Sequence, residues 1–200
     1  MKKNIIIIGC GGHAKSVIEI IESTNKWNII GLIGLENELN KKVLDYKVIG
    51  TDKDLKEIRE SYSNCINAIG QIKDSQKRLL VSEKLKHLKF ETPTISASSS
   101  IVSKSALIKS GVTIGHGAVI NANAIIGENC IVNTNAVIEH DAKIGDFCHI
   151  STGVLINGGA SIGAHSFIGS GAIIRENIEI PSNTILGAGK IILHWPVTLI

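Results

Sequence analysis

The chain has 200 residues, of which 44% are hydrophobic and 20% charged, and its formal net charge is +3. This length suits one large or two small domains with cores of their own. No uncharged apolar run approaches the roughly 18 residues that span a bilayer. No basic cluster carries interleaved aromatic residues either, so the composition argues against membrane insertion and against nucleic-acid binding.

The N-terminal residues and the cysteines indicate the cellular compartment of the protein. Residues 1–8 combine basic residues with a short apolar run, but Gly-rich sequence follows in place of a cleavage site, which argues against a signal peptide. The cysteines show no CxxC pairing, which favours reduced, packed thiols over disulfides or zinc. We therefore expect a cytoplasmic protein with four free thiols, at Cys10, Cys65, Cys130 and Cys148.

Charge is distributed unevenly along the chain. Residues 1–95 carry 16 basic and 12 acidic side chains, whereas residues 96–200 carry 5 basic and 6 acidic ones. Eleven charges are too few to cover the free surface of a 105-residue segment. We expect part of this second segment to be buried against other chains.

Strands and helices alternate over residues 1–95, the first predicted domain. Such alternation predicts a parallel sheet in a small Rossmann-like α/β domain. The predicted strands are 4–9, 28–33, 48–49 and 64–69, and the predicted helices are 13–23, 52–62 and 74–89. A polar connection over residues 94–100 is predicted to follow.

A glycine-rich turn joins the first strand to the first helix. Gly9, Gly11, Gly12, His13 and Ala14 satisfy the pattern G-x-G-x-x-G/A, which lets a backbone approach a phosphate at a helix N-terminus. A tight turn without a ligand is the alternative. A dinucleotide cofactor would also require an acid at the end of the second strand. The sequence offers none before residue 36, which disfavours an NAD-dependent oxidoreductase.

A six-residue repeat dominates residues 96–200, the second predicted domain. Aliphatic residues recur every six positions, with small residues two positions earlier and frequent glycines one position later. This period fits neither an α-helix nor a simple amphipathic strand, and predicts a parallel β-helix built from hexapeptides, which in bacteria is most often an acyltransferase. If three hexapeptides close one coil, residues eighteen apart stack. The repeat comprises Val102, Ile108, Ile114, Ile120, Ile126, Val132, Ile138, Ile144, Ile150, Ile156, Ile162, Ile168, Ile174, Ile180, Leu186 and Ile192.

Polar residues of the repeat segment gather around His140. This residue follows a core aliphatic by two positions, so it is expected at a corner, facing outward. An adjacent carboxylate holds an imidazole in one tautomer and makes it more basic, as a general base requires. We choose Asp141 over Glu139 as that partner. A surface histidine in a salt bridge is the alternative for His140, and His149 either binds a ligand or caps a turn.

A zinc site formed by histidines of the coil is a rival hypothesis. Zinc requires three or four convergent ligands. The candidate histidines do not stack at any multiple of eighteen residues, so we expect no metal; they are His116, His140, His149 and His165.

The order of these motifs resembles a known family. The Gly-x-Gly-Gly-His turn, followed by hexapeptides that contain residues 137–141 and 149–151, is similar to the bacterial hexapeptide-repeat sugar O- and N-acetyltransferases over residues 3–190. This is the sialic acid O-acetyltransferase group, which includes N-acetyltransferases of nucleotide-linked 4-amino sugars. The resemblance implies a left-handed coil, acetyl-CoA as the donor, and a homotrimer with active sites between neighbouring coils.

The resemblance also implies roles for individual residues. His140 would be the general base, oriented by Asp141, while Asn133 and His149 would line the acceptor and acetyl region. The amide of Gly158 would polarise the thioester carbonyl, as an oxyanion hole does. The nucleotide sugar would be held by Gly9, Gly11, Gly12 and His13.

The chain departs from the family pattern at two places. Gly34 and Leu35 stand after the second strand, where family members usually carry aspartates that contact the nucleotide or sugar. Residues 190–200 replace the usual Gly-x-Pro-Ala-Lys closing segment. We expect this apolar ending to pack over the last coil as an alternative cap.

Together these observations predict an acetyl-CoA-dependent acetyltransferase. Its expected reaction is N-acetylation of a nucleotide-linked amino sugar in surface glycan biosynthesis. One alternative is O-acetylation of sialic acid or a related nonulosonic acid. Another, from a different class, is an inactive trimeric β-helix scaffold.

Overall fold

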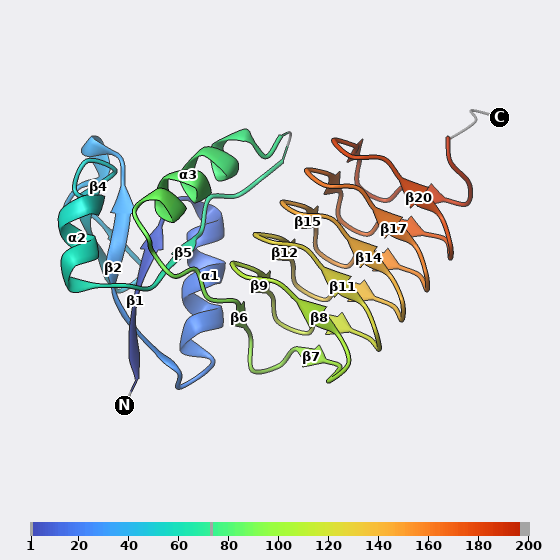
Figure 1. The fold of residues 1–200 in the computed structure, drawn as a ribbon, viewed down its shortest axis with the longest axis horizontal. Coiled ribbons are helices and arrows are strands. Elements are labelled where there is room, and N and C mark those ends of the chain that lie inside the picture. The colour runs from blue at the N-terminus through green and yellow to red at the C-terminus, as the bar shows by residue number, and fades with distance from the viewer. Residues whose placement is uncertain (1, 73, 197–200) are drawn as a thin grey trace. The chain divides into compact units, whose positions relative to one another are not determined.

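The computed structural model describes residues 2–72 and 74–196, which form two compact units (Figure 1). The first unit comprises Met1–Gly70 and Gln76–Pro93. The second comprises Thr94–Ile200 together with Gln71–Ser75, a short segment that precedes it in the sequence. Each unit is described by itself below.

A mainly parallel sheet forms the centre of the first unit, with the strand order β3-β4-β2-β1-β5. Only the β3–β4 pair is antiparallel. The elements in chain order are β1 (Lys3–Ile8), α1 (Gly12–Glu22), β2 (Trp27–Gly34), the 3-10 helix η1 (Glu36–Glu38), β3 (Lys42–Val43), β4 (Tyr46–Thr51), α2 (Leu55–Ser61), β5 (Cys65–Asn67) and α3 (Gln76–His87).

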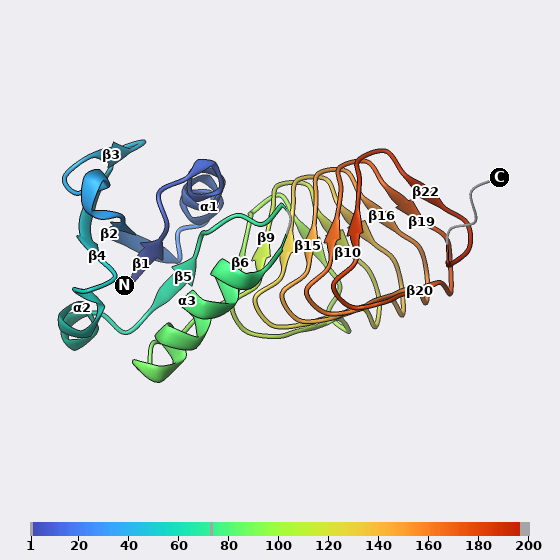
Figure 2. The ribbon, with the colours of Figure 1, turned by 90° about the horizontal axis from the view of Figure 1, so that it is seen from above.

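Helices cover both faces of this sheet. Figure 2 shows α1 and α2 on opposite sides of β1 and β2. Strand β1 is a run of buried isoleucines, as expected for a strand packed on both faces. On one face Leu55 of α2 and Leu85 of α3 pack with Ile6, Ile8 and Ile33. The predicted Rossmann-like α/β layer is confirmed.

The largest local difference from the sequence prediction is at β3 and β4. The sequence predicts a short strand at residues 48–49, whereas β4 spans Tyr46–Thr51 and forms a hairpin with β3. Leu44 lies in the connecting turn with a φ of 52°. Asp45, the second residue of this turn, is a common turn residue, but leucine rarely occupies the left-handed region, so the local sequence indicates the turn only weakly.

The second unit is a left-handed parallel β-helix built from three sheets, as the hexapeptides predict. The first sheet contains β7 (Ile101–Val102), β10 (Val119–Ile120), β13 (Val137–Ile138), β16 (Leu155–Ile156), β19 (Ile173–Ile174) and β22 (Ile191–Ile192). The second contains β8 (Leu107–Ile108), β11 (Ile125–Ile126), β14 (Lys143–Ile144), β17 (Ser161–Ile162) and β20 (Glu179–Ile180). The third contains β6 (Ile95–Ser96), β9 (Thr113–Ile114), β12 (Ile131–Val132), β15 (His149–Ile150), β18 (Phe167–Ile168) and β21 (Ile185–Leu186).

The register of the coil follows the predicted spacing. Val119 pairs with Val137, and Val137 pairs with Leu155, so residues eighteen apart stack on neighbouring rungs. The second side chain of each two-residue strand from β9 to β22 is buried in the coil, as Ile120 and Ile138 are, whereas Val102 and Ile108 on the first rungs are more exposed. The coil interior is therefore the periodic aliphatic core that the sequence predicts.

The coil begins one hexapeptide earlier than predicted. The sequence predicts a polar connection over residues 94–100, but Ile95–Ser96 is strand β6, which pairs with β9. Ser96 occupies the position that is aliphatic in the later rungs, so the first rung lacks the repeat signal. The polar-connection prediction is thus wrong at these residues.

The C-terminal segment covers the end of the coil. Ile192 is buried, and the half-buried indole of Trp195 packs against the interior cluster. Residues 197–200, which complete the predicted cap, lie outside the described residues. Among the helices described, none combines the length and hydropathy needed to cross a membrane.

Candidate active site

His140 and Asp141 form a pair at the corner between β13 and β14. His140 Nδ1 lies 2.8 Å from Asp141 Oδ2, and both side chains are more than half exposed. Asp141 has a φ of 61°, a conformation that aspartate tolerates better than most residues. The ring makes its carboxylate hydrogen bond with Asp141 and not with Glu139. The corner thus presents an imidazole and its carboxylate to the outside of the coil.

The hydrogen bonds of this pair fix the proton on the imidazole. A carboxylate only accepts, so Nδ1–H donates to Asp141 and Nε2 keeps its lone pair. The hydrogen bond with His140, and a second from Asn123 Nδ2 at 3.4 Å, hold the pKa of Asp141 below its usual value. The carboxylate therefore stays charged at neutral pH, and Nε2 is able to accept a proton.

Gly158 lies one rung beyond His140, against the face of the ring. A methyl group on Gly158 would lie 2.8 Å from His140 Nε2 and 2.7 Å from Cε1, so only glycine fits beneath this imidazole. Its amide N–H has no hydrogen-bond partner among residues 2–72 and 74–196. This N–H is thus an available donor on the rung next to His140.

Asn133 and His149 form a second group, on the third sheet and the corner that follows it. Asn133 Nδ2 lies 3.2 Å from His149 Nε2, and the Asn133 Oδ1 accepts the backbone N–H of Thr134 at 2.8 Å. His149 is 8% exposed and meets the ring of Phe167 edge-on. His149 is thus buried and Asn133 half-buried, in contrast to the exposed His140.

The two groups occupy different corners of one coil. His140 follows a strand of the first sheet, whereas Asn133 follows a strand of the third. The structure brings together His140, Asp141 and Gly158, and separately Asn133 and His149.

The glycine turn of the first unit lies between β1 and α1, as predicted. Gly9 has a φ of 110°, and a side chain there would contact Ala68 and Ile69, so the fold itself requires glycine. Gly11, the N-cap of α1, and Gly12 have nothing within 4 Å of an added Cβ. His13 is half-buried in the first turn of α1. Gly11 and Gly12 therefore leave open space in front of a helix N-terminus, where anions bind.

The structure explains the glycine that follows β2. A Cβ on Gly34 would lie 2.6 Å from Cys10 Sγ and 2.8 Å from Glu38 Oε2, so an aspartate has no room at this position. Glu38 instead turns back to accept the N–H of Leu35 at 2.8 Å. The acidic groups near this strand end belong to η1, at Glu36 and Glu38.

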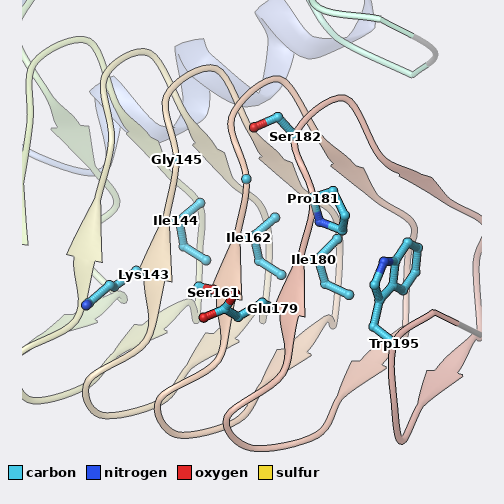
Figure 3. Close-up of a pocket in the computed structure, with 11 residues that line it drawn as sticks. Lys143, Ile144, Gly145, Ser161, Ile162, Glu179, Ile180, Pro181, Ser182 and Trp195 are labelled. Carbon is cyan, nitrogen blue, oxygen red and sulfur yellow. The ribbon is translucent and has the colours of Figure 1, made fainter.

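An open groove of about 720 Å³ lies along the second sheet (Figure 3). Figure 3 shows Lys143, Ser161 and Glu179 on neighbouring strands, with Trp195 beyond Ile180 at the end of the row. The groove contains none of the predicted site residues. Lys143 follows Asp141 by two positions, so the groove begins beside the His140 corner.

Two further sequence predictions concern the cysteine thiols and a possible metal site. All four cysteines are free, as the sequence predicts, and burial raises the pKa of Cys65 to about 12. Within the described ranges, no three His, Cys, Asp or Glu side chains are grouped so that they could hold a metal ion.

Comparison with known proteins gives the family. Residues 4–85 match the PglD N-terminal domain, and residues 105–140 and 123–158 match the bacterial transferase hexapeptide (six repeats). A mutant of perosamine N-acetyltransferase from Caulobacter crescentus, in complex with CoA and GDP-perosamine, is 32% identical, with a TM-score of 0.90. The match covers 96% of this chain and 89% of that one. The chain belongs to the bacterial hexapeptide-repeat sugar acetyltransferases.

Two further solved structures are similar to this chain. The acetyltransferase domain of PglB from Neisseria gonorrhoeae FA1090, in complex with acetyl coenzyme A, is 29% identical, with a TM-score of 0.88 over 97% of this chain and 92% of that one. WeeI from Acinetobacter baumannii AYE is 18% identical, with a TM-score of 0.74 over 99% of this chain and 100% of that one, and supports the fold alone. The comparison with curated proteins gives no match. The predicted family and enzyme class are confirmed.

Sequence reasoning missed the partners of His149 and His165. The carbonyl of Gln71 lies 2.7 Å from His149 Nδ1, and Ser75 Oγ lies 2.9 Å from His165 Nδ1. Neither Gln71 nor Ser75 belongs to a motif, and both precede the coil in the sequence. No sequence signal indicates these contacts.

Proposed function

We propose that this protein transfers an acetyl group from acetyl-CoA to the amine of a nucleotide-linked amino sugar. The observation that carries the proposal is the His140 corner. There Asp141 accepts Nδ1–H at 2.8 Å and Nε2 faces Gly158, at an exposed position where a substrate can reach it. This arrangement is that of a general base with an orienting carboxylate.

The proposed reaction uses these groups in sequence. The acceptor nitrogen attacks the thioester carbon, and His140 Nε2 takes a proton from that nitrogen. Asp141 stabilises the imidazolium that results, while the Gly158 N–H donates to the oxyanion. The C–S bond then breaks, and the protonated imidazole returns the proton to the CoA sulfur. A C–N bond forms, a C–S bond breaks, and the base is regenerated.

A homotrimer would complete the site. The outward residues of the first sheet are all aliphatic, which leaves an uncovered apolar face on a single chain. Packing this face against copies of itself would bring the His140 corner of one coil beside the Asn133 corner of the next. We place the acetyl and acceptor region between them, lined by Asn133 and His149. The outward residues are Ile101, Val119, Val137, Leu155, Ile173 and Ile191.

The nucleotide end of the acceptor is proposed to lie at the glycine turn. Gly11 and Gly12 leave room for a diphosphate at the N-terminus of α1, and Gly9 and His13 flank it. The structural relative with bound GDP-perosamine supports a sugar nucleotide as the ligand. Since acetyl-CoA and nucleotide sugars are cytoplasmic metabolites, the reaction is proposed for the cytoplasm.

An acceptor assay tests this function. The purified protein is given acetyl-CoA with GDP-perosamine, with a UDP-linked 4-amino sugar, or with free sialic acid, and thiol release is followed against a blank without acceptor. We expect release with at least one amino sugar nucleotide. Release with sialic acid alone would replace the proposal by O-acetylation. Release above the blank with none of these acceptors, together with no saturable heat on titration of CoA, would indicate an inactive scaffold.

A further inference from the structure

The segment Gln71–Ser75 is attached to the coil at both of its ends. The Gln71 carbonyl accepts a hydrogen bond from His149 Nδ1 at 2.7 Å, and Ser75 Oγ is hydrogen-bonded to His165 Nδ1 at 2.9 Å. Gln71 is 2% exposed and Ser75 is 6% exposed. Two short bonds to two imidazoles therefore hold this segment within the second unit.

The bond from Gln71 determines the tautomer of His149. A carbonyl oxygen only accepts, so Nδ1 must carry the proton. On the other side of the ring, Asn133 is oriented by the Thr134 N–H that its Oδ1 accepts at 2.8 Å, so its Nδ2 faces His149 Nε2 as a donor. Nε2 must then be unprotonated. The ring is held neutral, in the Nδ1–H form, by one group from the segment and one from the coil.

The second attachment lies at an unusual corner of the coil. The corner residues between the second and third sheets all have φ values of 54° to 69° on successive rungs, and they are Gly111, Asn129, Phe147, His165 and Asn183. Glycine and asparagine adopt this conformation readily and histidine does so more often than most residues, whereas it is unusual for Phe147. The rings of Phe147 and His165 stack with centroids 5.5 Å apart and an interplanar angle of 10°. His165 therefore bonds to Ser75 through Nδ1 and packs against Phe147 on the neighbouring rung.

We infer that Gln71–Ser75 is a positioning segment for the acetyl-donor site. It holds the His149 imidazole in the Nδ1–H tautomer through the Gln71 carbonyl, and Ser75 and His165 fasten it in place. This inference rests on the proposed function of His149 and Asn133 in the acetyl region. The consequence is a fixed pattern at that site, set before the donor substrate binds, in which Asn133 Nδ2 donates one hydrogen to His149 Nε2 and keeps its second N–H as a donor.

The tautomer of His149 tests the inference without an activity assay. Long-range proton–nitrogen correlation spectra of the whole protein labelled with nitrogen-15 in histidine report which ring nitrogen carries the proton, and His149→Gln assigns the signal. We expect Nδ1–H and an unprotonated Nε2 in the wild-type protein. In Ser75→Ala we expect exchange broadening or a mixture of tautomers at this ring. The Nε2–H form in the wild type would overturn the inference.

Kinetics then separate positioning from folding. Ser75→Ala is expected to raise KM for acetyl-CoA by about 3- to 10-fold, as expected for one lost hydrogen bond, and to change kcat by less than about 2-fold. His165→Asn should raise KM similarly without lowering the unfolding temperature, because asparagine suits this corner. Ser161→Ala, on the second sheet, is the matched control and should change neither.

The outcomes distinguish the two proposals. If Ser75→Ala and His165→Asn leave both the His149 tautomer and KM unchanged, the segment has no positioning role. If the wild-type protein transfers acetyl to no acceptor, the proposed function fails, while the spectra still decide whether the segment sets the tautomer.

Discussion

Two faces of the coil share one interior but differ outside. On the first sheet every outward residue is aliphatic, and Leu155, for example, is 37% exposed in the single chain. On the second sheet the outward residues change along the coil from Leu107 and Ile125 to Lys143, Ser161 and Glu179. The inward residues are buried aliphatics on both faces. The repeat thus builds the coil, and the outward residues determine what each face contacts.

The corner between these two faces carries His140. Its position places the imidazole at the edge of the apolar face and beside the more polar one. If the proposed trimer forms, His140 would lie at the edge of the contact between copies. Substitutions on either face, and at the corner that joins them, separate the roles of these surfaces.

The largest expected effect comes from a charge on the apolar face. Leu155→Lys would place an ammonium at the proposed contact between copies, where a buried unpaired charge costs about 3–5 kcal/mol. We expect a trimer for the wild type and monomers for the variant, measured by light scattering during size-exclusion chromatography. Ser161→Lys, on the second sheet, should leave the mass unchanged. Equal masses for all three proteins would refute the assignment of this face.

A substitution in the interior should act through stability instead. Ile156 is fully buried next to Leu155, and Ile156→Ala should cost about 2–5 kcal/mol, because it removes buried methyl groups and leaves a cavity. Ile162→Ala should cost a similar amount on the second sheet, since the interior is equivalent there. Urea unfolding at fixed protein concentration measures both. A large difference between the two variants would show that the interior is not uniform.

At the corner, His140→Ala should reduce kcat/KM by about 100-fold or more if the imidazole is the general base. The side chain is more than half exposed, so the unfolding temperature should not change. Undiminished transfer by this variant would remove His140 from the mechanism. An amine that is already deprotonated depends on a general base less than a hydroxyl does. A large loss of kcat/KM with an amine acceptor is therefore stronger evidence for the base than the same loss with a hydroxyl acceptor.

The smallest effects are expected at Asp141. Asp141→Asn should lower kcat/KM by about 10-fold, because it removes one charge-assisted hydrogen bond at an exposed site. In the wild type the pKa of Asp141 is lowered chiefly by His140. Its contribution to stability is therefore present above the ordinary aspartate value and is lost as the pH falls through the lowered one. In His140→Ala, carboxyl NMR titration should show the pKa rising toward its ordinary value; no rise would mean that the pair does not form.

Some parts of the fold could be predicted from the sequence and others could not, for physical reasons. Each hexapeptide buries one aliphatic residue, so a pattern of six residues suffices to predict the interior, the register and the stacking of Gly158 beside His140. The β3–β4 hairpin was missed because Leu44, which rarely adopts a left-handed conformation, takes the first position of its turn. Strand β6 was missed because Ser96 replaces the expected aliphatic residue. The sequence prediction failed where a single residue departed from the expected local pattern.

The sequence by itself determined the two folds, the glycine turn, and the His140–Asp141 pair, because each depends on residues close together or on a strict repeat. Only the tertiary structure decided which carbonyl faces His149 and which hydroxyl faces His165. These partners lie 78 and 90 residues away along the chain. Contacts of this kind depend on where the backbone returns in space, and the composition of a short segment such as Gln71–Ser75 carries no periodic signal of that return.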